Sequence, residues 1–164
     1  MNIIKEDFYK KSKPLRQVKV GLVQINNSFS GQNYLPYSTA CLESYAVAHK
    51  NSDYHFLFLP HVYKRLPIRT IVNHLTEADV IGFSTYVWNE QISLAIAKKL
   101  KEIDKSKFII FGGPSVPDNK FGKAENYLRT NPFINVLSHQ EGERTILKLL
   151  DDFPEHDFDT TPNI

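Results

Sequence analysis

Short apolar runs alternate with amphipathic segments along most of the chain, and this alternation restricts the fold more than any other feature of the sequence. Polar residues do not alternate with apolar ones in these runs, as they would in a strand with one solvent-exposed face. We therefore expect strands buried on both faces, as in a parallel sheet. The segments between them carry apolar residues at helical spacing, which suits crossover connections. The apolar runs are 18–25, 54–59, 79–84, 107–113 and 134–139.

Each connection contains a predicted helix. Pro36 and Pro67 open two of them, because proline is favoured in a first helical turn. Asn89 precedes a third and can cap it by accepting from a free backbone N–H. A weaker helix covers about 120–130, and the last begins at about Glu141. The pattern predicts an α/β fold: a flavodoxin-like, doubly wound five-stranded parallel sheet in the order 2-1-3-4-5, with helices on both faces.

Composition limits the classes of partner. The 164 residues are 41% hydrophobic and 23% charged, which fits one globular domain. A net charge of +2 gives no reason to expect a nucleic-acid partner. No apolar segment approaches the ~20 residues that span a bilayer, and no signal-peptide stretch is present, so we expect a cytoplasmic protein without a membrane partner. The single cysteine excludes an internal disulfide and a cysteine-built metal cluster.

Three regions are expected along the chain. Residues 1–16 form a basic N-terminal extension, and residues 17–151 form the α/β domain. Residues 152–164 are acidic and contain two prolines. We interpret this last region as a linker to a C-terminal domain that the chain lacks.

The ligand site of an open parallel sheet lies beyond the carboxyl ends of its strands, where the strand order reverses. For the order 2-1-3-4-5 this point lies between the first and third strands. The unusual residues of the sequence gather in the loops that would meet there. These loops are "NNSFSGQNYLP", "STYVWN", "GGPSVP" and "HQEGE".

Two of these loops offer polar groups and room for a ligand. Gly112 and Gly113 let a ligand approach the backbone, or they supply the positive φ of a turn. Pro114 stiffens the rest of that loop. Ser84 and Thr85 can hydrogen-bond a ligand, or they can bond their own loop backbone.

Large and acidic residues complete the candidate site. Tyr86 and Trp88 can pack on a flat ligand or fill the space between helix and sheet. Glu141, Gly142 and Glu143 open the last helix, where the helix dipole favours carboxylates. The same carboxylates can accept hydrogen bonds from ligand amides or hydroxyls.

Several enzyme classes lack their motifs. No G-x-G-x-x-G, G-x-x-x-x-G-K-[ST] or G-x-S-x-G is present. A phospho-acceptor receiver domain would need acidic residues that the first and third loops do not supply. Two alternatives stay open from the residues alone: a flavodoxin-like FMN electron carrier, and a non-catalytic interaction domain. No catalytic residue and no metal ligand is predicted.

The motifs "ADVIGFSTYVWNEQ", "FIIFGGPSVP" and "INVLSHQEGERTILKLL", in this order, resemble the N-terminal cobalamin (B12)-binding domain of B12-dependent radical SAM enzymes. The similarity covers about residues 18–150. It implies a cobalamin-binding module that holds the corrin for methyl transfer or radical chemistry, above the carboxyl ends of the strands.

The resemblance also implies roles for the loop residues. The turn at 84–86 would border the nucleotide tail or the corrin edge, and 112–114 would leave room for the tail. The loop at 141–143 would meet the corrin's peripheral amides, with Gln140 in place of the family's first glycine. Asn26 and Asn27 would contribute from the first loop.

Two departures from the wider family are visible. The region "QINNSFSG" lacks the histidine that ligates cobalt in many cobalamin domains. One cysteine cannot supply the three thiolates of a radical SAM cluster. The iron–sulfur cluster and S-adenosylmethionine are therefore expected only on the missing domain. We expect that this chain is not catalytic alone. Its partner would be a C-terminal radical SAM domain or a separate catalytic subunit.

Overall fold

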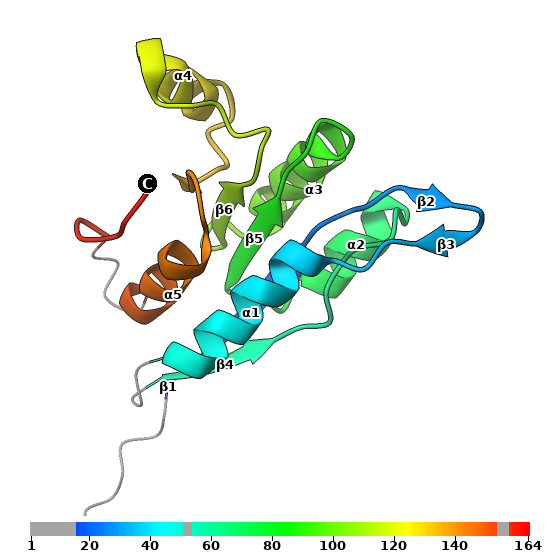
Figure 1. Ribbon diagram of the computed structural model, residues 1–164, viewed down its shortest axis with the longest axis horizontal. Coiled ribbons are helices and arrows are strands. Elements are labelled where there is room, and N and C mark those ends of the chain that lie inside the picture. The colour runs from blue at the N-terminus through cyan, green and yellow to red at the C-terminus, as the bar shows by residue number, and fades with distance from the viewer. Residues whose placement is uncertain (1–15, 51–53, 154–157) are drawn as a thin grey trace, which may run out of the picture.

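A computed structural model describes residues 16–50, 54–153 and 158–164 (Figure 1). The strands of the main sheet are β1 (Arg16–Val23), β4 (Tyr54–Phe58), β5 (Val80–Ser84), β6 (Phe108–Gly112) and β7 (Val136–Leu137). A separate hairpin pairs β2 (Ser28–Phe29) with β3 (Gln32–Asn33). The helices are α1 (Tyr37–His49), α2 (Ile68–Leu75), α3 (Glu90–Ile103), α4 (Lys123–Thr130) and α5 (Glu143–Asp152), with a 3₁₀ turn η1 (Lys120–Gly122) before α4.

The main sheet is parallel, in the order β4-β1-β5-β6-β7. Numbered along the chain, this is the predicted order 2-1-3-4-5. The sequence prediction of a flavodoxin-like doubly wound sheet is therefore confirmed. The reversal of strand order lies between β1 and β5, where the ligand site of such a sheet is expected.

Two apolar layers, one on each face of the sheet, hold the helices. On one face α2 and α3 pack through residues such as Leu75 and Leu100. On the other face α1 and α5 pack through residues such as Ala46 and Leu149. Helices thus cover both faces, as the uniformly apolar strands predicted (Figure 1). The pairing of α1 with α5 over one face is what creates the candidate site.

Three local features differ from the sequence prediction. The loop after β1 contains the β2–β3 hairpin, which was not foreseen. β7 has only two residues where the apolar run suggested 134–139. Asn89 precedes α3 as expected, but its side chain makes no cap bond. Its amide instead donates to the carbonyls of Ile25 (3.0 Å) and Ser84 (3.1 Å), and so joins the ends of β1 and β5.

The structure describes much of the predicted C-terminal region but almost none of the predicted N-terminal extension. Residues 1–15 of the predicted basic extension lie outside the described residues, and Arg16 already begins β1. Within the predicted linker 152–164, Asp152 is the last residue of α5, and the described residues 158–164 lie against the domain. Phe158 packs on Phe108 with ring centroids 4.9 Å apart, and Thr161 is buried. Within the described part of the chain, no helix has the length and apolar character needed to cross a membrane.

Candidate functional site

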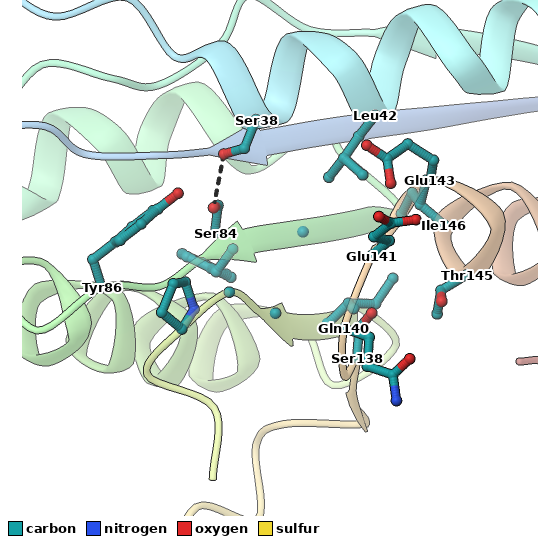
Figure 2. A pocket seen from close by; sticks show the side chains of 17 residues that line it. Ser38, Leu42, Ser84, Tyr86, Ser138, Gln140, Glu141, Glu143, Thr145 and Ile146 are labelled. Carbon is teal, nitrogen blue, oxygen red and sulfur yellow. Dashed lines mark hydrogen bonds between the residues drawn. The ribbon is translucent and has the colours of Figure 1, made fainter. Parts of the chain in front are cut away.

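A pocket of about 270 Å³ opens at the carboxyl ends of β5 and β6, between the sheet and the helices α1 and α5 (Figure 2). Figure 2 shows Tyr86 at one end of the pocket and Glu141 and Glu143 at the other. Its lining residues are Ser38, Leu42, Gly82, Phe83, Ser84, Tyr86, Ile110, Gly112, Gly113, Pro114, Ser138, Gln140, Glu141, Gly142, Glu143, Thr145 and Ile146.

Two strand glycines explain why a pocket exists inside an otherwise filled apolar layer. Gly82 pairs with Ile110 and Gly112 with Ser84, so both glycines face the α1–α5 side. A Cβ on Gly82 would meet only the Cδ2 of Leu22, at 3.0 Å. A Cβ on Gly112 would touch only Ser138, from 3.5 Å outwards. The space that two side chains would otherwise fill is therefore left open to a ligand.

The floor of the pocket presents a hydrogen-bond acceptor. Ser38 Oγ donates its single hydrogen to Oε1 of the buried Gln24, at 2.7 Å. The 3.0 Å bond between Ser38 Oγ and Ser84 Oγ must then take its hydrogen from Ser84. Ser84 Oγ is left with lone pairs. Together with the carboxylates of Glu141 and Glu143, it favours a ligand edge that carries N–H or O–H donors.

Thr85 lies behind the pocket and does not line it. Its hydroxyl and its backbone N–H both donate to the carbonyl of Gly112, at 2.8 Å and 2.7 Å. A Cβ on Gly113 would come within 2.6 Å of the Thr85 carbonyl oxygen, and Gly113 has a φ of +95°. Gly113 is thus required by the turn and by its close approach to Thr85, whereas Gly112 leaves the space in the pocket.

The aromatic pair stands at the pocket mouth. Tyr86 lines the pocket, and Trp88 stacks on it with ring centroids 4.6 Å apart and an interplanar angle of 13°. Arg65 donates to the carbonyl of Trp88 at 2.7 Å. Trp88 is outside the lining and 43% exposed, so it supports Tyr86 from the solvent side.

The two asparagines of the first loop lie elsewhere. Asn26 is buried, and its amide donates to the carbonyls of Tyr34 (3.1 Å) and Leu35 (3.3 Å). Asn27 is exposed, and both line a different cavity of about 460 Å³ beside the hairpin and Lys64. Asn26 therefore shapes the loop that leads into α1.

The loop before α5 forms the acidic wall. Gln140 has a φ of +59°, a conformation that glycine adopts more readily. This turn ends the extended chain after β7, so α5 begins at Glu143 and leaves Glu141 in the loop. Gly142 lies against α1, where a Cβ would be 3.2 Å from the Cδ2 of Leu42.

Several lining residues were not expected from the sequence. Ser38, Leu42 and Thr145 come from helices, and their place depends on how α1 and α5 pack together. Gly82 is hidden inside an apolar run, and only the strand register shows that it faces the pocket. Among the described residues, no group of three or more His, Cys, Asp or Glu side chains could hold a metal ion.

The fold and the pocket define a class: a doubly wound α/β domain whose ligand site lies over the carboxyl ends of its strands. Among the described residues that line the pocket there is no lysine or arginine, so a ligand anchored by a terminal phosphate lacks its usual partner there.

Comparison with known proteins narrows this class. No protein-family model matches the chain. Over 117 residues, 71% of the chain, it is 31% identical to the cobalamin-dependent radical SAM methyltransferase TokK of Streptomyces tokunonensis. Over 117 residues it is 28% identical to the 2-(S-pantetheinyl)-carbapenam-3-carboxylate methyltransferase of Streptantibioticus cattleyicolor. The predicted resemblance to cobalamin-dependent radical SAM enzymes is confirmed for this part of the chain.

The match covers only part of these relatives. The chain spans 17% of the length of each of the two methyltransferases. The solved structure of the apo cobalamin-dependent S-adenosylmethionine radical enzyme OxsB shares the fold, with a TM-score of 0.61 and 19% sequence identity. That alignment covers 87% of this chain and 19% of OxsB.

Proposed function

We propose that this chain is a cobalamin-binding module that works with a radical SAM domain. The observation that carries the proposal is the pocket between β5, β6, α1 and α5, in a chain that is 31% identical over 117 residues to a cobalamin-dependent methyltransferase. The pocket lies beyond the carboxyl ends of β5 and β6, the edge at which open parallel sheets bind their ligands, and beside the reversal between β1 and β5.

The residues of the pocket fit the chemistry of this cofactor. Gly82 and Gly112 leave a space with apolar walls, which suits a flat heteroaromatic group such as the base of cobalamin's nucleotide tail. Ser84 Oγ and the carboxylates of Glu141 and Glu143 are acceptors, and the corrin ring carries primary amides that donate. Bound cobalamin would supply a cobalt centre able to carry a methyl group. The residues of this chain would hold and orient it.

The acceptor-rich lining is a poorer fit to FMN. The terminal phosphate of FMN is strongly anionic, and the pocket offers carboxylates instead of cations. The first loop, which would have to hold that phosphate, is instead folded into the β2–β3 hairpin. Cobalamin is therefore the better-supported ligand.

The catalytic half is proposed to lie on another domain or subunit. The relatives are about six times as long as the matched segment, and one cysteine cannot bind a radical SAM cluster. Methyl transfer is the proposed reaction because both curated relatives are methyltransferases by name. The loop 24–35 contains no histidine that would hold the cobalt.

A binding experiment tests the proposal directly. The chain is incubated with hydroxocobalamin or with FMN, desalted, and examined by visible absorption. We expect corrin absorbance in the protein fraction and no retained flavin. The His139→Ala variant is expected to give the same corrin spectrum, because His139 lines a neighbouring cavity and not the pocket itself. A protein fraction without corrin would refute the proposal.

A further inference from the structure

A second cavity adjoins the candidate pocket, and the C-terminal segment forms part of its wall. This cavity measures about 490 Å³. Gly113, Pro114, Ser138 and Gln140 line both spaces, so the two are separated only by the loops that carry these residues. A ligand seated in the pocket can therefore extend over these loops into the second cavity.

Backbone contacts dock the C-terminal segment, residues 158–164, on this side of the domain. The backbone N–H of His139 donates to the carbonyl of Asn163 at 2.8 Å. The hydroxyl of the buried Thr145 donates to the carbonyl of Pro162 at 3.0 Å. These bonds fix the segment to the loop after β7 and to the first turns of α5, the two elements that form the acidic wall of the pocket.

The lining of the second cavity combines apolar side chains, from Pro114, Val116 and Ile164, with polar ones. Asn119, Gln140 and Asn163 contribute amide side chains, and Asp118 contributes a carboxylate. Amides both donate and accept, and the carboxylate accepts. The cavity thus suits neutral hydrogen-bonding groups, such as the primary amides at the edge of a corrin.

We infer that residues 158–164 are a binding element of the ligand site: they form one wall of a second subsite, which receives amide groups from the edge of the ligand held in the pocket. The inference rests on the proposed function, because it takes cobalamin as that ligand. It assigns a role in binding to a segment whose composition suggests only a linker.

Asn163 allows the docking to be removed by one substitution. Its φ of +60° is open to asparagine and glycine but closed to proline, whose ring holds φ near about −65°. The Asn163→Pro variant should release the segment, whereas Asn163→Gly keeps the backbone conformation and removes only the side-chain amide from the second cavity. A chain shortened to end at Phe153 removes the segment altogether and leaves α5 complete.

The test measures hydroxocobalamin affinity by absorbance titration and the hydrogen exchange of the His139 amide. We expect Asn163→Pro and the shortened chain to bind about 5- to 10-fold more weakly, the effect of losing one or two hydrogen bonds. In Asn163→Pro the His139 amide should also exchange faster. Asn163→Gly should keep the protection of the His139 amide and bind about 2- to 5-fold more weakly than wild type, the effect of losing one side-chain hydrogen bond.

The outcomes separate this inference from the proposed function. Wild-type affinity in the shortened chain would overturn the inference, while leaving cobalamin binding to the pocket intact. The same holds for Asn163→Pro if its His139 amide has lost protection. Failure of the wild-type chain to bind hydroxocobalamin would overturn both.

Discussion

Gly112 and Gly113 are neighbours with different roles, and substituting each one separates ligand binding from folding. Gly112 ends β6 and faces the pocket, where a Cβ makes ordinary contacts at 3.5 Å or more with Ser138. Gly113 has a φ of +95°, and a Cβ there would lie 2.6 Å and 2.8 Å from backbone atoms of Thr85. The two variants to compare are Gly112→Val and Gly113→Ala.

For Gly112→Val we expect weaker binding without loss of stability. Valine suits a strand better than glycine by up to about 1 kcal/mol, so the free protein should be as stable as wild type or more so. The two methyl groups would occupy space that the ligand needs. Overpacking costs about 1–3 kcal/mol, which corresponds to a dissociation constant for hydroxocobalamin roughly 5- to 150-fold higher.

For Gly113→Ala we expect loss of stability. The left-handed backbone conformation costs an L-residue about 1–2 kcal/mol, and the overlap with Thr85 adds to this. The free energy of unfolding should fall by about 2 kcal/mol or more. Urea unfolding followed by circular dichroism measures it, and an absorbance titration measures binding.

Two results would refute the reasoning. Unchanged hydroxocobalamin affinity in Gly112→Val would mean that the ligand does not enter this pocket. Wild-type stability in Gly113→Ala would mean that the turn after β6 tolerates a side chain, contrary to the contacts with Thr85.

Three further predictions concern residues around the site. Replacing Asn89 by alanine removes a buried amide that donates to two carbonyls and accepts from the Tyr86 N–H. The free energy of unfolding, measured in urea, should fall by about 2–4 kcal/mol. For the exposed neighbour Gln91→Ala it should fall by about 0.5 kcal/mol or less. Trp88, the only tryptophan, stacks on Tyr86 at the pocket mouth. Hydroxocobalamin should therefore quench its fluorescence, and Trp88→Phe should abolish that signal. Unquenched emission at saturating ligand would place the ligand elsewhere. Burial, and then the hydrogen bond to Glu90, raises the pKa of Tyr127 above 10.0. The stability gained from its protonated phenol is therefore complete below pH 10 and is lost as the pH rises above that value. Tyr127→Phe should lose less stability than wild type between about pH 8 and about pH 11, and equal losses would contradict this.

The fold was predictable because its signal is local. Each strand of the main sheet follows from an apolar run, and the helices between them follow from spacing and from residues such as Pro36 and Pro67. The hairpin was missed although the pair Ser30–Gly31 is a turn signal, since its strands are only two residues long and exposed. β7 is shorter than its apolar run because only Val136 and Leu137 pair with β6.

The site was less predictable because it depends on contacts between distant segments. The loops after β5 and β7 supplied Ser84, Tyr86 and the acidic wall, because topology places both loops at the carboxyl-terminal edge of the sheet. Ser38 reaches the pocket only because α1 packs over β5. The sequence left the Asn26 side chain available to a ligand, but in the fold its amide nitrogen donates to two loop carbonyls and its oxygen accepts from the Gln24 side chain.

The two sides of the pocket are held by different contacts, and this difference bears on how the pocket would select a ligand. On the strand side, Asn89 joins the ends of β1 and β5, and Thr85 joins β5 to β6 through two bonds to Gly112. The opposite loop, with Gln140 in a left-handed conformation, is held at His139 by the C-terminal segment. The strand glycines therefore set the shape that can enter, while the acidic loop presents acceptors to the donors at the ligand's edge. Substitutions on the strand side should weaken binding by filling the space, and substitutions in the segment should weaken it by removing contacts at the ligand's edge.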